Sequence, residues 1–431
     1  MAEPQPLDLK QTLESLPPIP KSQAGTFREF IASYKTNSSN KVPILVALDD
    51  DPTGTQTCHG INVLTVWDTA TLIEEFRNTP KGAGFFILTN SRAFHSPEAK
   101  SLMHEVCTNL KSAASEAGVE FEIVLRGDST LRGHFPLEPE AAEDILGKAD
   151  AWILCPFFLQ GGRYTIGDVH YVAEGDKLIP AAQTPFAKDA TFGYRSSNLR
   201  DYVVEKSNGS ISSDRVQSLS IVDIRNDGHG GADKVAQQLK DFPKGSVVIV
   251  NAAAVEDIDV VIMGLLKATA VYGKKFLFRT GAAFVSSRLA IPQIEPISAA
   301  QLSLSPAVGG LIIAGSYVPK TTAQLEVLRE KGGDKLTTIV LDVPRLLESE
   351  EQAKAEIKRD LDMADAEIGK GQDVLIMTSR DLVTGEDQRK SLDIGSTVAK
   401  ALVTFLVDLK TKPRYIIAKV SLPRIPPLGD Y

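Results

Sequence analysis

Short apolar runs that alternate with longer helical patterns constrain the fold of this chain more than any other feature. These runs lie at 42–48, 84–89, 121–125, 151–155, 218–222, 246–250 and 275–278. Continuous apolar strands separated by helices are typical of parallel sheets, because the crossover helices cover both faces of the sheet. The pattern therefore predicts an α/β fold built on a mainly parallel sheet.

Two segments interrupt this alternation. Residues 160–190 include GGRYTIGDVHYV and EGDKLIP, which favour a hairpin-like insertion over another strand–helix unit. Residues 291–310 are rich in Pro, Ser and Gly and lack a strong period, so they are predicted to be an interdomain linker. After Leu311 the apolar strands and helices resume, and the last strand is YIIAK (415–419).

We therefore expect two domains, each a mainly parallel sheet flanked by helices. Residues 1–40 are predicted to form a partly disordered leader or docking arm, because Pro, Ser, Gln and Lys dominate them. The N-terminal domain is expected at 41–290 and the C-terminal domain at 311–431.

Composition narrows the class of protein. The formal net charge of −8 argues against nucleic acid as a partner, since phosphate-backbone binding needs clustered Lys and Arg. Three widely spaced cysteines fit neither a disulfide framework nor a zinc site, and no apolar run approaches the roughly 18 residues of a membrane span. We expect a cytoplasmic protein with no membrane partner.

An acidic turn follows the first apolar strand. The segment VALDDDPTGTQT (46–57) delivers Asp49, Asp50 and Asp51 into a Pro-Thr-Gly turn. Loops at the carboxyl ends of parallel strands form the ligand crevice, and three adjacent carboxylates need a cation, a basic partner or solvent to remain ionised together. The turn is a candidate catalytic site. Two alternatives stay open: a solvated turn that caps a helix, and a phosphatase in which Asp49 attacks phosphorus.

A second polar turn follows the strand at 121–125. The segment LRGDSTLRGHF (125–135) combines Arg126 and Arg132 with Asp128 and two hydroxyl side chains. Arginine binds carboxylates in a planar, bidentate way, and hydroxyl and carboxylate side chains bind sugar hydroxyls. The mixture suits a small polyhydroxy acid, although an internally salt-bridged loop remains an alternative.

Two weaker loops lie in similar positions. QGGRYTIGDVHYV (160–172) contains Arg163 and His170, and FRTGAAFV (278–285) contains Arg279. Each of these three side chains is a candidate contact for a shared anionic ligand. Taken singly, each is more often a surface or structural residue.

Phosphate-binding signatures are sparse. The chain has no GxxxxGK[ST] loop, which excludes the P-loop class, and GHGGAD (228–233) departs from a dinucleotide fingerprint because Asp233 stands where a third Gly is needed. AGSYVPKT (314–321) places Gly315 and Ser316 between a strand and a helix, where free amides and the helix dipole favour phosphate.

Six segments occur together in a characteristic order. They are DDPTG, RGDSTLRGH, GGRYTIGDVHYV, TPFAKDATFGYRSSNL, FRTGAAFV and AGSYVPKTTAQ. In this respect the chain resembles, from about residue 41 to 419, the four-carbon acid sugar kinases. The resemblance implies an acid-sugar-binding N-terminal domain, a C-terminal domain that binds ATP with Mg²⁺, and an active site in the cleft between them. The implied reaction is phosphorylation of a tetronate such as threonate, erythronate or an oxo form.

The resemblance also implies roles for particular residues. Asp50 and Asp51 match its catalytic turn, and Asp51 is the implied metal ligand. The implied substrate-binding residues are Arg126, Asp128, Ser129, Arg132 and Arg279. The implied nucleotide-binding residues are Gly315, Ser316, Thr378 and Ser379.

The chain departs from the family pattern near its end. Val318 stands where the nucleotide loop has a second serine, and VSLPRIPPLGDY (420–431) replaces a Gly-Gly-x-Thr turn and the strands after it. We therefore expect a C-terminally truncated member with impaired phosphoryl transfer, because transfer depends on how the phosphates are positioned. A catalytically inactive sugar-acid-binding protein or defective isoform is the alternative. The sequence leaves open the tetronate, the hydroxyl attacked, a homodimeric state, and whether this end is biological or a gene-model artefact.

Overall fold

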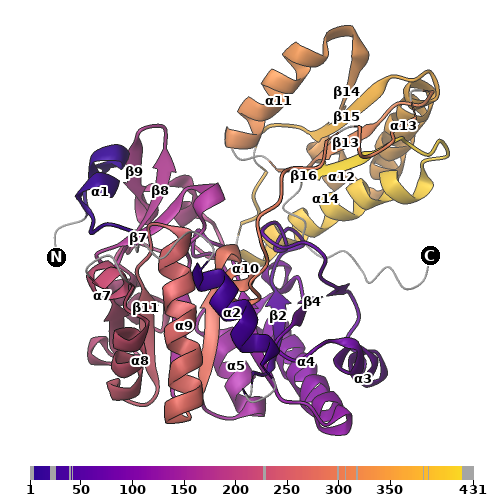
Figure 1. Ribbon diagram of the computed structural model, residues 1–431. Helices are drawn as coiled ribbons and strands as arrows, with labels where there is room; N and C mark the ends of the chain where they lie inside the picture. Colours follow the sequence, from indigo (N-terminus) through magenta and orange to yellow (C-terminus); the bar gives the residue numbers. More distant parts are fainter. Residues whose placement is uncertain are drawn as a thin grey trace. The chain divides into compact units, whose positions relative to one another are not determined.

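The computed structural model divides into two compact units, Met1–Gln293 and Ile294–Tyr431 (Figure 1). No helix in the described part of the chain is long and apolar enough to cross a membrane. The structure describes residues 4–19, 26–37, 40, 42–226, 230–298, 300–305, 307–316, 319–381, 383–386 and 388–419.

The first unit is built on an eight-stranded sheet in which every pairing is parallel, which confirms the predicted fold class. The strand order is β10-β11-β6-β12-β5-β2-β4-β3. In chain order the strands are β2 (Ile44–Asp49), β3 (Val63–Leu64), β4 (Gly84–Leu88), β5 (Phe121–Arg126), β6 (Ala151–Cys155), β10 (Val216–Leu219), β11 (Ser246–Val250) and β12 (Phe276–Thr280).

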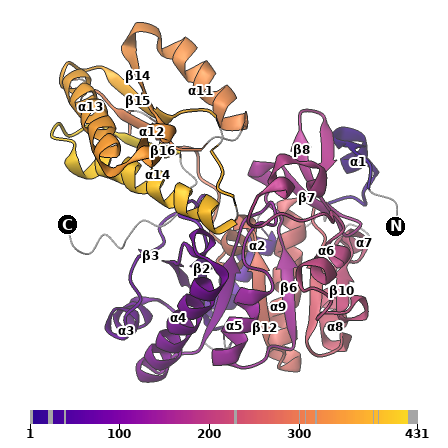
Figure 2. The same cartoon turned by 180° about the vertical axis from the view of Figure 1, so that it is seen from behind.

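Helices cover both faces of this sheet, because successive side chains of a strand point to opposite sides. In β2, Leu45 and Ala47 belong to the apolar cluster of helix α9 (Val255–Tyr272), whereas Val46 belongs to that of α4 (Ser96–Ala117). Figures 1 and 2 show the helices flanking the sheet. The α9 side also holds α2 (Thr26–Thr36), α7 (Ile221–Arg225), α8 (Ala232–Asp241) and α10 (Ala282–Arg288), and the α4 side holds α3 (Thr69–Asn78) and α5 (Leu137–Leu146).

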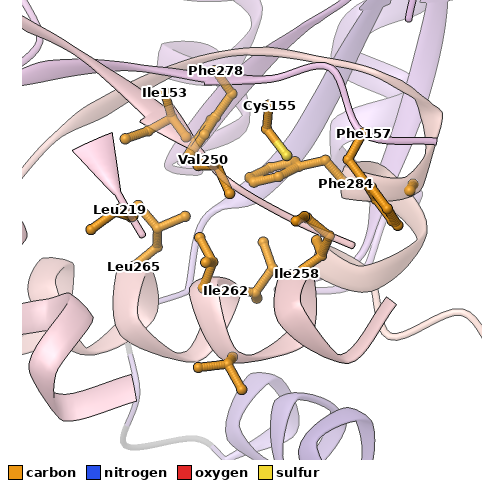
Figure 3. Packing of buried hydrophobic residues seen from close by; sticks show 14 of the residues in the cluster. Ile153, Cys155, Phe157, Leu219, Val250, Ile258, Ile262, Leu265, Phe278 and Phe284 are labelled. Carbon is orange, nitrogen blue, oxygen red and sulfur yellow. The ribbon is translucent and has the colours of Figure 1, made fainter. Parts of the chain in front are cut away.

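The packing against α9 forms the larger core. Ile258, Ile262 and Leu265 of α9 lie against sheet residues that include Ile153 and Phe278 (Figure 3). Each of these five side chains is 3% exposed or less, so the interface is dry and the carboxyl ends of the strands are held in fixed positions.

One predicted strand is wrong in its extent. The apolar run 218–222 predicts strand throughout, but β10 ends at Leu219. The Ser220 hydroxyl accepts a hydrogen bond from the Asp223 backbone N–H at 3.1 Å and caps α7. Serine is a favoured N-cap, so its local hydrogen bond overrides the strand propensity of the residues after it.

The predicted hairpin-like insertion is confirmed. Strands β7 (Arg163–Ile166), β8 (Val169–Glu174) and β9 (Lys177–Pro180) form an antiparallel sheet. The leader adds a fourth strand, β1 (Leu7–Asp8), to the edge at β9, and helix α1 (Leu9–Ser15) follows it.

Described parts of the leader are anchored to the first unit by hydrogen bonds. Gln183 Nε2 donates to the Pro4 carbonyl at 2.8 Å, and Arg225 Nη1 donates to the Pro17 carbonyl at 2.6 Å. Arg28 Nη1 in α2 donates to the carbonyl of Ile291, beyond the end of α10, at 2.7 Å. These described parts of the leader are therefore packed against the first unit.

The second unit has a four-stranded parallel sheet of order β14-β15-β13-β16, and helices again cover both faces. Its last helix begins at Gln388. Its strands are β13 (Leu311–Ala314), β14 (Leu336–Leu341), β15 (Asp373–Thr378) and β16 (Ile416–Lys419), and its helices are α11 (Pro319–Gly332), α12 (Val343–Glu348), α13 (Glu350–Gly369) and α14 (Gln388–Asp408). The departures predicted at Val318 and at 420–431 lie outside the described residues.

Candidate functional site

The carboxyl end of β2 places the three aspartates beside the end of β5. Asp49 is opposite Arg126 in the parallel register, and the Asp50 N–H donates to the Arg126 carbonyl at 3.1 Å. The turn closes when the Gly54 N–H donates to the Asp51 carbonyl at 3.1 Å. A Cβ at Gly54 would lie 1.9 Å from Asp49 Oδ2, so this close approach requires glycine.

Asp49 and Arg126 form a buried ion pair. Arg126 Nε donates to Asp49 Oδ1 at 2.8 Å and Nη2 donates to the same oxygen, and the side chains are only 2% and 5% exposed. Burial raises the pKa of Asp49 to about 7, against the opposing effect of the Arg126 charge. The other Arg126 donors bond to the Gly127 and Asp51 carbonyls, at 3.1 and 3.2 Å. Arg126 therefore donates its hydrogen bonds to other groups of the protein.

Asp51 is held by a residue that the sequence reasoning missed. Arg92, in the 3₁₀ turn after β4, donates through Nη2 to Asp51 Oδ2, and its Nη1 lies 3.7 Å from Asp128 Oδ2. The Thr53 N–H donates to Asp51 Oδ1 at 2.8 Å. Burial alone would raise the pKa of Asp51, but the Arg92 charge and the Thr53 hydrogen bonds hold it below its usual value. A signal existed, since Arg92 also follows the carboxyl end of an apolar strand.

The predicted substrate loop folds around Asp128. Arg132 Nε donates to Asp128 Oδ2 at 2.7 Å, and the Thr130 hydroxyl donates to the same oxygen. Burial would raise the pKa of Asp128, but Arg132 and Arg92 outweigh it and keep this carboxyl ionised. Ser129 takes part through its backbone carbonyl, which accepts a hydrogen bond from a histidine ring at 2.7 Å.

Asp50 and Arg279 are close but incompletely paired. Arg279 Nη2 lies 3.7 Å from Asp50 Oδ2, and Arg279 Nη1 lies 3.8 Å from Glu138 Oε2. Neither carboxylate oxygen of Asp50 accepts a hydrogen bond from any described residue, although its side chain is only 3% exposed. A Cβ at Gly127 would lie 1.6 Å from Arg279 Nη1, so a glycine opens the space for this guanidinium. A buried, unsatisfied carboxylate beside a cation is typical of a site that awaits a ligand.

The two histidines of these loops are structural. His170 Nε2 donates to the Ser129 carbonyl, its Nδ1 lies 3.0 Å from the Thr165 hydroxyl, and burial lowers its pKa to about 4. His134 Nε2 lies 3.1 and 3.0 Å from the Ser91 and Phe94 carbonyls, and burial lowers its pKa as well. Because its pKa is so low, His170 is neutral near pH 7 and supplies no positive charge to an anion.

The candidate nucleotide residues meet at one edge of the second sheet. Parallel pairing of β13 with β15 places Gly315 and Ser316 near Thr378, whose hydroxyl lies 3.5 Å from the Gly315 carbonyl. The Thr321 hydroxyl donates to Ser316 Oγ at 3.2 Å. Ser379 instead accepts a hydrogen bond from the first residue of α12 at 3.2 Å, which turns its hydroxyl toward that helix.

The described residues of the first unit could hold Mg²⁺ only if a bound molecule, such as a phosphate, supplied further ligands to the ion. In the described part of the chain, no three His, Cys, Asp or Glu side chains are grouped so as to hold a metal ion. Asp51 already accepts hydrogen bonds from Arg92 and Thr53, whereas Asp50 retains its lone pairs. Mg²⁺ often binds one or two carboxylates and completes its octahedron with water and substrate phosphates. The residues present fit that mode.

Comparison with known protein families matches both units. Residues 45–288 match the sugar-binding N-terminal domain, and residues 311–418 match the nucleotide-binding C-terminal domain. The chain belongs to the family of proteins that these sugar-binding N-terminal and nucleotide-binding C-terminal domains define. It thus combines a sugar-binding domain, which holds the Asp50 and Arg279 site, with a nucleotide-binding domain, an arrangement consistent with a kinase-like enzyme.

Solved structures of similar proteins include two described under the family name DUF1537. A protein from Bordetella bronchiseptica, crystallised as a domain-swapped dimer with bound citrate, has 18% identity and a TM-score of 0.43, with 88% of this chain and 82% of that chain covered. A protein from Haemophilus influenzae has 18% identity and a TM-score of 0.45, with 84% of this chain and 83% of that chain covered. No curated protein matches the chain.

Proposed function

We propose that this protein transfers the γ-phosphate of ATP to a hydroxyl group of a four-carbon acid sugar, a tetronate. One observation carries the proposal: the buried Asp50 carboxylate accepts no hydrogen bond from the described residues and lies among arginines in a sugar-binding domain. A carboxylate in this state is available to a substrate hydroxyl. Arg279, whose buried Nη1 has no hydrogen-bond partner among the described residues, favours a substrate that is itself an anion.

The residues of this edge take different parts in the proposed reaction. We infer that the acid sugar lies against Asp128, Arg132 and Arg279, because their polar groups converge on one loop. Arg126 acts indirectly, since it holds Asp49 and thereby fixes the turn that carries Asp50.

Asp50 is the better candidate for the base. Asp51 has a lowered pKa and is tied to Arg92, so it accepts a proton poorly and suits a contact to Mg²⁺. In the proposed step Asp50 takes the proton of the attacking hydroxyl. The hydroxyl oxygen then bonds to the γ-phosphorus, and the bond from phosphorus to the bridging oxygen breaks, so ADP leaves with the electron pair. Mg²⁺ bound to ATP would neutralise charge on the phosphates.

The nucleotide side of the proposal rests on the second unit. Gly315 and Ser316 precede the amino end of α11, and Thr378 lies at the same edge of the sheet. Free amides and hydroxyls at such an edge suit phosphate oxygens. We propose that ATP binds there.

A coupled assay for ADP, run with threonate and erythronate, tests the proposal. A kinase forms ADP only when ATP, Mg²⁺ and a tetronate are all present. A protein that only binds sugar acids shows tetronate binding by isothermal titration calorimetry and no ADP formation. A phosphatase releases phosphate from a tetronate phosphate without ATP. The geometry disfavours this last outcome, because Arg126 holds the buried Asp49 that would be the nucleophile.

A further inference from the structure

Most of the arginines at the sugar-binding edge already have an acidic partner. Arg126 is paired with Asp49, Arg92 with Asp51, and Arg132 with Asp128. Arg279 has two carboxylates within 4 Å, those of Asp50 and Glu138. An arginine that neutralises a protein carboxylate has less to offer the carboxylate of a ligand, because part of its charge and several of its donors are used.

Arg163 is different. Within the described residues no acidic side chain lies within ion-pair distance of its guanidinium, and its one side-chain hydrogen bond runs from Nη1 to the carbonyl of Gly161 in its own turn. Its Nε is buried and donates to no described residue. Burial lowers the pKa of Arg163, since few charges compensate it. The guanidinium is thus a poorly solvated cation with no carboxylate of a described residue within ion-pair distance, and the charge of Asp128 acts on it from farther away.

The backbone places Arg163 at the same edge of the sheet as the proposed catalytic turn. Arg163 and Phe158 exchange backbone hydrogen bonds of 2.9 and 3.1 Å, which ties the start of β7 to the segment just after β6. The guanidinium carbons of Arg132 and Arg163 lie 5.3 and 5.6 Å from the ring centre of Phe186. A ring shared by two guanidinium groups restricts their planes and holds both groups in one place.

The free donors of Arg163 have the geometry that carboxylates prefer. Nη1 is used by Gly161, which leaves Nε and Nη2, the two donors along one side of the guanidinium. Arg126 uses this same pair of donors to hold Asp49. Two parallel N–H groups can each donate to one oxygen of a carboxylate, and such a bidentate pair is among the stronger polar contacts in proteins.

We propose that Arg163 binds the carboxylate of the acid sugar and selects acids over neutral sugars of the same length. This inference rests on the proposed function for the identity of the substrate. It assigns the recognition of the acid to the antiparallel insertion, while the hydroxyl chemistry belongs to the turn after β2.

Arg163→Gln tests this role by direct binding. Isothermal titration compares the full-length parent and variant with threonate and erythronate, and with the neutral alcohols threitol and erythritol as probes without a carboxylate. We expect tetronate affinity to fall about ten- to a hundredfold, the effect of losing one charge-assisted bidentate contact, and the weak binding of the alcohols to stay the same. Arg195→Gln is the matched control, because the side chain of Arg195 is 90% exposed on the same unit.

Chemical rescue separates binding from a structural role. Guanidinium ion at low millimolar concentration should restore part of the tetronate affinity of Arg163→Gln, because the ion can occupy the vacated space. A variant that merely distorts its loop gains nothing from the added ion, and that result would overturn the proposal.

The possible failures are distinguishable. If the parent binds tetronates but forms no ADP, the kinase proposal fails, and a selective loss in Arg163→Gln still supports the carboxylate role. If Arg163→Gln binds tetronates within twofold of the parent, the inference is wrong whether or not the parent is a kinase. If the parent binds none of the acids, both are wrong.

Discussion

Asp50 is the residue on which the proposed chemistry depends. It lies 3.7 Å from Arg279 and 3.9 Å from Arg126, yet accepts no hydrogen bond from a described residue. We predict that Asp50→Asn lowers kcat by at least about a hundredfold, the scale of general-base catalysis. The free energy of unfolding should fall as well, because Arg279 and Arg126 lose part of their charge compensation, although no hydrogen bond is lost. Steady-state kinetics and urea denaturation measure the two quantities, and near-normal turnover would exclude Asp50 as the base.

Gly127 controls the position of Arg279. A Cβ there would overlap Nη1, at 1.6 Å, so Gly127→Ala must displace the guanidinium. We expect kcat/KM for the tetronate to fall about a hundredfold, because a shift of about 1 Å in a positioning group has that effect. Gly369→Ala is the control, since its added Cβ would meet only Thr411 Oγ1, at 4.0 Å. If both variants behave alike, the placement of Arg279 is unimportant.

The sequence could identify the polar residues of the site but not their pairing. Arg126, Asp128 and Arg279 were found because each follows the carboxyl end of an apolar strand, where parallel sheets bind ligands. Arg92 satisfies the same rule and was missed, because SRAF lacks the dense polar composition of the other turns. Arg92 pairs with Asp51 because β4 lies beside β2 in the sheet. Local sequence patterns do not contain this strand order.

At the scale of elements, His170 links the hairpin β7–β8 to the substrate loop. Its pKa is about 4 in the folded protein, and that of an unfolded histidine is about 6.5. A depressed folded pKa contributes stability that is present above pH 6.5 and is lost as the pH falls toward 4, because protonation favours the unfolded chain. The full loss is on the order of 3 kcal/mol, from a pKa difference of about 2.5.

We therefore predict that the difference in unfolding free energy between the parent and His170→Gln shrinks as the pH falls from 7 to 4. Comparison of the two proteins cancels the titration of the carboxyl groups that they share. Chemical denaturation at several pH values measures the difference. A difference that stays constant across this range would show that His170 does not titrate with folding.

Elements were predictable where burial alone decides them. All strands of the main sheet except β3 overlap with predicted apolar runs, because both faces of a parallel sheet are covered. Two elements were not predictable for a shared reason: a local or a distant partner decides them. Ser220 ends β10 because its hydroxyl caps α7. Leu7 forms a strand because it pairs with the edge strand β9.

At the scale of the whole molecule, the sugar-binding site is built within one unit. All the contacts of Asp50, Arg163 and Arg279 described above lie within Met1–Gln293. We predict that a chain of residues 1–293 folds and binds tetronates within a few-fold of the full protein, and that it binds no ATP. Isothermal titration with each ligand checks this. Loss of tetronate binding in a folded fragment would show that the second unit completes the site.

The short strand β1 ties the described start of the leader to the antiparallel sheet that carries Arg163. It closes the edge of the sheet at β9, and Pro4 is held by Gln183, while Arg163 begins β7 of the same sheet. A protease that removed the first eight residues would expose the backbone of β9 and loosen the sheet without touching the catalytic turn. We therefore expect proteolytic trimming at this end to lower the stability of the antiparallel sheet that carries Arg163.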